Sequence, residues 1–445
     1  MMGYIVCFNL FQSKNIINSP YNVRLDSMAD RVVRGEILDN AGNVLAKTEV
    51  DENGNETRVY PYGNLYAHVV GYDAHGKSGI ESAENFNLLT SSTFLPEQIL
   101  NELQEKKNTG DNVITTLNTQ VQKSAYDALG NQKGAVIVME ATTGKILAMV
   151  SKPDFDPNTV KEGWEQLSNA EESVLLNRAT QGLYAPGSVF KIVTTLEYMR
   201  ENANYSSYSY LCESEMEHEG TVIHCAKQRE HGTESLMSSF ANSCNTSYSN
   251  IGLSLNFEKY KKTANDLLFD KKLPSVLPYS KSKFQLEKSS ASYEVMMTAI
   301  GQGKTQVTPY HMALVTSAIA NGGILMKPYL VDEVVSASGQ SVDKRMPEKY
   351  SVLMNSKEAS QLKIFMQEVV EHGTASALKN DVYTVAGKTG TAEYSSDKEK
   401  THSWFVGFTN VENPDIVISV VVENASNSGV SAVSVANKVL DKYYQ

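Results

Sequence analysis

The chain has 445 residues, which is too long for one ordinary domain and predicts about two or three. Hydrophobic residues make up 41% of the sequence and charged residues 20%, which allows a substantial core and excludes disorder throughout. The formal net charge of -11 argues against nucleic acid, and against an anionic membrane surface, as the main partner.

Residues 1–11 form an apolar segment that is interrupted only by Gly3 and Asn9. It is shorter than the roughly 20 residues that span a bilayer, and it lacks the flanks of a secretion signal. A short amphipathic segment or a buried strand would explain it. We expect instead that residues 1–20 are the outer part of a membrane anchor whose first half is missing from this chain.

Residues 21–125 form a mixed region with glycine-rich turns. Apolar residues at 32–39 and 44–46 flank an Asn/Gly turn, which predicts two short strands. Apolar residues three or four apart predict helices over 96–106 and 118–129. We expect this region to be a separate N-terminal domain.

The remaining residues, 126–445, have strands at both ends and helices between them. This pattern predicts an α+β fold, in which an antiparallel sheet built from distant parts of the chain is backed by helices. The expected strands cover 134–140, 145–150, 383–393, 403–409 and 415–423, and the expected closing helix covers 431–443.

The first of three short motifs is Ser188-Val189-Phe190-Lys191. Ser-x-x-Lys alone is a weak signal, because Ser280/Lys283 and three other pairs share it. Here Pro186-Gly187 precedes an apolar helix, so Ser188 is expected at a helix N-terminus with Lys191 one turn later. A helix cap with a surface lysine would explain the pair equally well. In a catalytic site, a lysine with a lowered pKa would activate the serine hydroxyl.

The second motif is Ser243-Cys244-Asn245 and the third is Lys388-Thr389-Gly390. Ser243 and Asn245 are also good helix caps, so the second motif is weak alone. The third occurs once, in a strand with two glycines, where a ligand often approaches the backbone closely. The alternative interpretation of the third motif is a glycine-containing strand end with no function. Lys388 is the expected second cation that lowers the pKa of Lys191.

Two of the four cysteines, Cys212 and Cys225, bracket a short loop. We expect them to form a disulfide or a redox-active pair, with free thiols as the close alternative. Nearby histidines, His218, His224 and His231, make a zinc site conceivable. Their spacing fits no standard zinc pattern, so no metal ligand is assigned.

The order of the three motifs resembles the set found in β-lactamases and penicillin-binding proteins. The whole chain after residue 30 is similar to class B penicillin-binding proteins, which are peptidoglycan D,D-transpeptidases. One segment departs from the family pattern, because this chain has Asp39-Asn40-Ala41-Gly42 where the family usually has Asp-Arg-Asn-Gly. Further matching segments are Arg34-Gly35, Ala67 to Gly71, Gly79 to Glu81, Pro153 to Asn158, Asn177 to Ala179, Ile300 to Gly303 and Trp404 to Gly407.

The resemblance implies a role for each motif. Ser188 is the nucleophile, Lys191 its base, and Ser243 the relay that carries a proton to the leaving amine. Asn245, Lys388, Thr389, Gly390 and Thr391 bind the substrate, and the amides of Ser188 and Thr391 form the oxyanion hole. No cofactor is required.

The resemblance also implies the biological setting. Peptidoglycan stem peptides are the substrates, and β-lactams are covalent inhibitors. The N-terminal domain resembles the pedestal that contacts a polytopic glycan polymerase, and the catalytic domain lies outside the bacterial cell membrane. The enzyme would serve cell division, cell shape or sporulation.

Two other classes of protein share part of this pattern. A serine β-lactamase or D,D-carboxypeptidase has the three motifs, but class A β-lactamases add Glu-x-x-Leu-Asn, and Gly252 stands where that glutamate would precede Leu255-Asn256. A non-catalytic β-lactam sensor or scaffold predicts a signalling segment or a broken motif, and the sequence has neither.

Overall fold

The computed structural model describes residues 28–104, 106–393 and 400–445. The predicted anchor, residues 1–20, lies outside the described residues. Within the described ranges, no helix is both long and apolar enough to cross a membrane. The described chain divides into two compact units. The first holds the residues up to Gln122 with Pro153–Leu176 and Tyr329–Met346, and the second holds the rest.

The first unit is built on a six-stranded sheet in the order β15-β14-β6-β2-β3-β4. Its strands are β2 (Ile37–Leu38), β3 (Val44–Val50), β4 (Glu56–Val59), β6 (Asn112–Thr115), β14 (Val331–Val335) and β15 (Ser341–Lys344). A separate parallel pair joins β1 (Val32–Val33) to β5 (Asn108–Thr109). The single strand expected over 32–39 is therefore wrong. Gly35 lies between β1 and β2, where a Cβ atom would come within 2.0 Å of the carbonyl oxygen of Asp111.

Short helices complete the first unit. They are η1 (Gly63–Tyr66), α4 (Gly79–Ala83), α5 (Asn85–Leu88), α6 (Leu95–Leu103), η2 (Pro157–Thr159) and α8 (Val160–Ser168). A buried ion network fixes α4: Glu81 bonds Arg34 at 2.6 Å and Arg58 at 2.7 Å. The helix α7 (Thr119–Leu129) begins in this unit and ends in the second.

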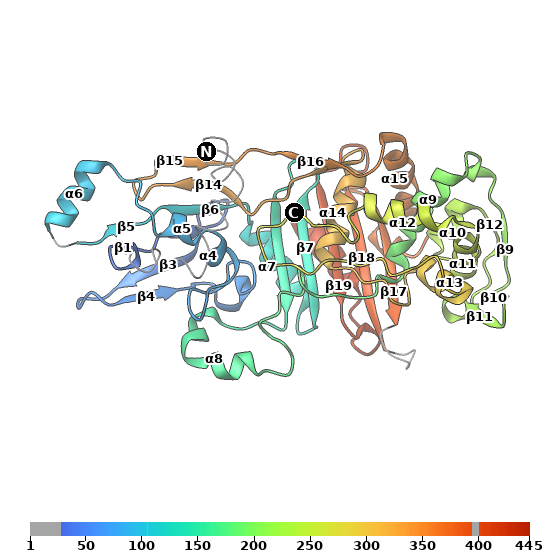
Figure 1. Ribbon diagram of the computed structural model, residues 1–445, viewed down its shortest axis with the longest axis horizontal. Coiled ribbons are helices and arrows are strands. Elements are labelled where there is room, and N and C mark those ends of the chain that lie inside the picture. The colour runs from blue at the N-terminus through green and yellow to red at the C-terminus, as the bar shows by residue number, and fades with distance from the viewer. Residues whose placement is uncertain (1–27, 105, 394–399) are drawn as a thin grey trace. The chain divides into compact units, whose positions relative to one another are not determined.

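The second unit contains a five-stranded antiparallel sheet in the order β17-β18-β19-β7-β8 (Figure 1). The strands are β7 (Gly134–Glu140), β8 (Ile146–Lys152), β17 (Val385–Glu393), β18 (Thr401–Thr409) and β19 (Ile416–Val422). The central strand β19 is buried along its whole length, as its run of valines and isoleucines predicts. Because β17 is an edge strand, one side of its backbone is left unpaired by the sheet.

Helices pack on this sheet and form a second cluster beside it. The helix α14 (Pro309–Ala320) packs across β7, β18 and β19 and is buried at every position, as an apolar sequence on all sides predicts. The others are α9 (Lys191–Glu201), α10 (Leu236–Ala241), α11 (Asn245–Ser254), α12 (Phe257–Asp266), α13 (Ser292–Ala299), α15 (Ser356–Glu371) and α16 (Ala432–Tyr443). Short 3-10 turns are η3 (Gly187–Phe190), η4 (Tyr205–Ser207), η5 (Ala226–Gln228), η6 (Ser376–Leu378) and η7 (Ala425–Asn427).

The second unit also contains small two-stranded sheets. The strand β9 (Tyr210–Cys212) pairs with β12 (Gly232–Glu234), and between them β10 (Glu215–His218) pairs with β11 (Thr221–His224). A further pair joins β13 (Ile324–Met326) to β16 (Lys349–Val352). The insertion formed by β9 to β12 leads directly into α10 and α11, which flank the second motif.

Candidate active site

The nucleophile candidate Ser188 lies in the 3-10 turn η3, immediately before α9 begins at Lys191. Gly187 has a left-handed φ of +54°, and a Cβ atom there would lie 2.5 Å from the carbonyl oxygen of Thr391. Its amide donates to the carbonyl oxygen of Gly301 at 2.8 Å. The turn therefore fits tightly between β17 and the segment at Gly301, and only glycine fits at position 187.

The side chain of Lys191 is fully buried and points to the second motif. Its ammonium group donates to the carbonyl oxygen of Ser243 at 2.7 Å, to the Ser243 hydroxyl at 3.3 Å and to Oδ1 of Asn245 at 2.8 Å. Burial lowers the pKa of Lys191 to about 8. This value brings the amine into the range in which a lysine can act as a general base.

The second motif connects α10 to α11 through a strained residue. Ser243 has a left-handed φ of +57°, which is uncommon for a residue with a side chain. Cys244 caps α11, and Asn245 begins that helix. The Asn245 amide nitrogen donates to the carbonyl oxygen of His224 at 3.1 Å, so its Oδ1 is turned toward Lys191.

The third motif supplies a second buried cation. The Lys388 ammonium group donates to the Ser243 hydroxyl at 3.0 Å and to the carbonyl oxygen of Thr389 at 3.2 Å. Burial, and then the charge of Lys191, lower the pKa of Lys388 well below 10.5. The lowered pKa of Lys191 is attributable to its own burial, whereas the repulsion expected between the two lysines acts on Lys388.

Thr389, Gly390 and Thr391 continue along the edge strand. The Thr389 hydroxyl bonds the hydroxyl of Thr374 at 2.6 Å, and Thr391 is exposed. At Gly390 a Cβ atom would lie 3.1 Å from the carbonyl oxygen of Pro186, so the strand lies close to the turn that carries Ser188. The third motif and the first are therefore neighbours.

The structure thus brings all three motifs together, with one expected contact missing. In the part of the chain that the structure describes, the Ser188 hydroxyl forms no hydrogen bond, so its bond to Lys191 is not made. In unliganded enzymes such bonds are often long and tighten when substrate binds. The arrangement offers a half-buried hydroxyl, two lysines with lowered pKa values and an unpaired strand edge.

Two residues near the site were not expected from the sequence. Thr374 orients the Thr389 hydroxyl, and the Tyr248 ring lies 5.1 Å below the Lys191 ammonium group. Thr374 is 15 residues from Thr389 and carries no motif. Tyr248 is one helical turn after Asn245, which is the only sequence signal that it faces the same way.

The sulfur atoms of Cys212 and Cys225 are 3.6 Å apart, and both residues are free thiols. The predicted disulfide is therefore not formed in this structure. Cys244 joins them, with its sulfur 3.7 Å from that of Cys225, and His231 Nδ1 lies 3.3 Å from Cys212 Sγ. The hydrogen bond between Cys225 and Cys244 lowers the pKa of the Cys225 thiol.

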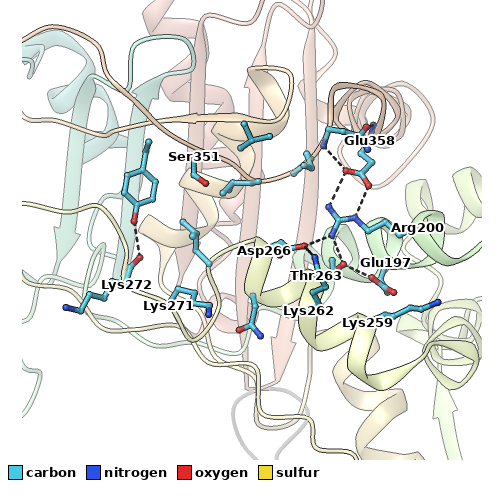
Figure 2. Close-up of a pocket in the computed structure, with 17 residues that line it drawn as sticks. Glu197, Arg200, Lys259, Lys262, Thr263, Asp266, Lys271, Lys272, Ser351 and Glu358 are labelled. Atoms are coloured by element: carbon cyan, nitrogen blue, oxygen red, sulfur yellow. Dashed lines mark hydrogen bonds and ion pairs between the residues drawn. The ribbon is translucent and has the colours of Figure 1, made fainter.

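A pocket of about 980 Å³ lies elsewhere in the second unit and contains none of the predicted site residues. Figure 2 shows charged side chains from α9, α12 and α15 around it. Arg200 forms ion pairs with Glu358 at 2.8 Å and with Asp266 at 3.2 Å. In addition, the Thr263 hydroxyl donates a hydrogen bond to Glu197 at 2.5 Å. These ion pairs hold three helices together and involve no catalytic motif.

Comparison with known proteins decides the family. Residues 134–441 match the penicillin binding protein transpeptidase domain, and residues 34–113 match the penicillin binding protein A dimerisation domain. The chain belongs to the penicillin-binding protein transpeptidase family. It is a class B penicillin-binding protein, as the sequence motifs predicted. The predicted α+β fold with an N-terminal pedestal domain is also confirmed.

Relatives of this penicillin-binding protein cover nearly its full length. The peptidoglycan D,D-transpeptidase PbpA of Mycolicibacterium smegmatis is 31% identical over 88% of this chain and 84% of its own. A D,D-transpeptidase domain from Eggerthella lenta is 31% identical with a TM-score of 0.83, covering 93% of this chain and 98% of its own. The ceftriaxone acyl-enzyme complex of penicillin-binding protein A from M. tuberculosis is 27% identical with a TM-score of 0.85, covering 95% and 100%.

Proposed function

We propose that this penicillin-binding protein is a peptidoglycan D,D-transpeptidase that cross-links stem peptides through an acyl-enzyme on Ser188. The observation that carries the proposal is the pair of buried lysines, Lys191 and Lys388, that bond one hydroxyl between them. Relatives named as peptidoglycan D,D-transpeptidases, and a related acyl-enzyme complex with a β-lactam, support it.

In the first half of the reaction, Oγ of Ser188 forms a bond to the carbonyl carbon between the two terminal D-alanines. The hydroxyl proton passes to the neutral amine of Lys191. The C–N bond then breaks, and D-alanine leaves with a proton relayed through Ser243. The geometry supports this relay, since Ser243 accepts a hydrogen bond from each lysine.

In the second half, the amine of a neighbouring stem peptide attacks the ester carbon. The new C–N bond forms as the bond to Oγ breaks, and the proton of the amine returns to Ser188 through Lys191. Throughout, the amides of Ser188 and Thr391 would stabilise the oxyanion, and such a donor typically contributes about 10²–10³ in rate. The close packing of Gly187 against the Thr391 carbonyl supports this pairing.

Substrate binding would use the edge strand β17. An extended stem peptide can pair with the free edge of an antiparallel sheet, and Lys388 and Thr389 lie where its carboxylate would be bound. Asn245 would hold the peptide amide. The same residues would hold the carboxylate of a β-lactam, whose opened ring stays attached and blocks the incoming nucleophile.

The proposed setting is the outer face of a bacterial membrane, where peptidoglycan is assembled. The match of residues 34–113 to a dimerisation domain supports a protein partner for that part of the chain. We infer that the partner is a polytopic glycan polymerase whose strands this enzyme cross-links.

Intact-protein mass spectrometry after mixing with benzylpenicillin tests the proposal. We expect a persistent adduct of one drug per chain, mapped by peptide digestion to Ser188 and absent in Ser188→Ala. Rapid multiple turnover of the drug would instead indicate a β-lactamase. With a stem peptide and an acceptor amine in place of the drug, hydrolysis that releases D-alanine without any cross-linked product would indicate a carboxypeptidase.

A further inference from the structure

Four side chains with soft ligand atoms meet beside the second catalytic motif. The sulfurs of Cys212, Cys225 and Cys244 and a ring nitrogen of His231 all lie within 4.8 Å of one another. The three cysteines are buried, and His231 is half-buried. We propose that these four residues bind a zinc ion, and that this ion holds the second motif in its catalytic geometry.

Three separations within the cluster match those of a tetrahedral zinc site, and the others are within 4.8 Å. With Zn–S bonds of about 2.3 Å and a Zn–N bond of about 2.0 Å, two sulfur ligands lie about 3.8 Å apart and a sulfur and a nitrogen about 3.5 Å. The observed separations are 3.6 Å for Cys212–Cys225, 3.7 Å for Cys225–Cys244 and 3.3 Å for Cys212–His231. A disulfide would need about 2.05 Å and would leave one cysteine and the histidine unused.

The ligand set also selects the metal. Three thiolates and one imidazole in tetrahedral positions form a Cys₃His set, which is a common structural zinc site. Magnesium and calcium prefer oxygen ligands, and thiolates discriminate against both. Each cysteine releases its proton to solvent as the ion binds, so binding consumes no other reactant.

The four ligands come from four different segments of the insertion and of α11. Cys212 ends β9, and its partner in β12 is Gly232, which places the adjacent His231 beside it. Cys225 follows β11, and Cys244 is the N-cap of α11. One ion would therefore tie both strand pairs of the insertion to the start of α11.

The insertion needs such a link because it has almost no core of its own. Between positions 210 and 234, the only buried apolar residues are Cys212, Ile223 and Cys225. Large apolar side chains in the same segment, Leu211 and Val222, are 60% and 44% exposed. Small modules with too little buried apolar surface commonly depend on a metal or disulfides.

The cluster is linked to the catalytic lysine by two hydrogen bonds. Cys244 lies between Ser243 and Asn245 in the second motif. The Asn245 amide donates to the carbonyl of His224, the residue before Cys225, and its Oδ1 accepts from Lys191. An ion bound by Cys225 and Cys244 would fix both ends of this contact, which makes the four ligands positioning residues for the second motif.

Metal analysis of the protein purified without a histidine tag and without added metal is the first test. We expect about one zinc ion per chain, retained through gel filtration. Cys212→Ser and His231→Ala should lose it, whereas His218→Ala should keep it, because His218 lies in the same insertion but outside the cluster. Zinc-free protein with three alkylatable thiols among these cysteines, or with a Cys212–Cys225 disulfide, would overturn the proposal.

Cobalt substitution tests the wild-type chain even if the variants fail to fold. Zinc removed by a chelator and replaced by Co²⁺ should give a thiolate-to-cobalt charge-transfer band and the visible bands of tetrahedral cobalt. A pale spectrum without charge transfer would mean that surface oxygens bind the metal, and would reject the site.

The positioning role has its own measurement. The zinc-free protein should be acylated by benzylpenicillin at least about tenfold more slowly, with recovery when Zn²⁺ is returned, since such supporting interactions typically contribute 10–100-fold. Unchanged acylation without zinc would overturn this role. Because metal content is measured apart from catalysis, failure of the zinc proposal is distinguishable from failure of the proposed transpeptidase function.

Discussion

Lys191 and Lys388 donate to the same acceptor, the hydroxyl of Ser243, at 3.3 and 3.0 Å. Both side chains are fully buried, and two buried ammonium groups so close together cannot both remain charged without a large cost. The pair therefore favours a state with one neutral amine. The neutral amine of Lys191, which acylation requires, becomes its main form above about pH 8.

The first prediction concerns the base. Lys191→Ala should fold normally and be acylated about 10²–10⁴-fold more slowly, because a general base typically contributes that much. Stopped-flow acylation by a chromogenic cephalosporin measures it. Lys283→Ala is the matched control, since Lys283 is the exposed lysine of a Ser-x-x-Lys pair outside the site. Near-normal acylation of Lys191→Ala would reject the assignment.

The second prediction concerns pH. Because burial lowers the pKa of Lys191 to about 8, the neutral base predominates above that pH and declines below it. The acylation rate should therefore rise with pH, reach a plateau above about 8, and fall about tenfold per unit below it. Circular dichroism at each pH would exclude unfolding as the cause. A rate that stays constant down to about pH 6 would contradict Lys191 as the base.

The third prediction concerns the glycine that supports the nucleophile turn. Gly301 has a φ of +78°, and a Cβ atom there would lie 1.9 Å from the carbonyl oxygen of Gly187. Gly301→Ala should displace the turn that carries Ser188 and greatly reduce penicillin labelling. Gly220→Ala, with a φ of +75° and nothing within 4 Å, should cost only about 1–2 kcal/mol of strain and leave labelling intact. Equal labelling of the two variants would refute the packing argument.

The fourth prediction concerns the first unit. Glu81 is fully buried between Arg34 and Arg58, so Glu81→Gln would leave two buried guanidinium groups without their counter-charge. Removing one partner of a buried ion pair typically costs about 3–5 kcal/mol. Peptide-level hydrogen exchange in β3 and β4 should show the loss. Glu49→Gln, which removes the exposed partner of Lys47, should have little effect.

The same network gives stability a pH dependence. Burial raises the pKa of Glu81, but Arg34 and Arg58 outweigh it, so the pKa lies below 4.5 in the folded protein. The contribution of the Glu81 carboxylate to the free energy of unfolding is therefore fully present above about pH 4.5. It is lost as the pH falls through the pKa that Glu81 has in the folded protein. Protection in β3 that is equally strong at pH values well below this range would contradict the network.

Much of the second unit was predictable because its strands are continuous apolar runs. The strands expected over 134–140 and 415–423 appear as β7 and β19, and the closing helix appears as α16. The turn between 141 and 144 also connects the two strands that it was expected to connect. Local pattern is sufficient where burial is complete on both faces of a sheet.

Tertiary contacts were not predictable in this way. The region 32–39 looked like one strand, but close approach of Asp111 to Gly35 divides it into two strands of different sheets. The division into a domain at 21–125 and another at 126–445 stays a prediction. The structure groups two later segments, Pro153–Leu176 and Tyr329–Met346, with the N-terminal residues. Which distant segments join a unit depends on contacts that no local pattern encodes.

The candidate site shows the same division. The motif residues were predicted together because the order of the three motifs resembles the set found in penicillin-binding proteins, although the hydrogen bond between Ser188 and Lys191 is not made. The complete cluster was not predicted because its ligands come from four segments with irregular spacing, so Cys244 was not connected with Cys212 and Cys225. The three candidate histidines cannot be told apart by sequence spacing. The pairing of β9 with β12 places His231 beside Cys212.

The strand order of the central sheet has a consequence for how this chain is made. Ile416 pairs with Glu140, so β7 has no neighbour on one side until almost the whole chain has emerged from the ribosome. β-Pairing between such distant segments is slow, because the long loop between them must close, at a cost in conformational entropy, before the pairing can form. Lys388 of the third motif lies on β17, which joins the sheet only through β18. A nascent or truncated chain lacking the last strands would therefore carry Ser188 without the third motif beside it, and it would need protection from aggregation until synthesis ends.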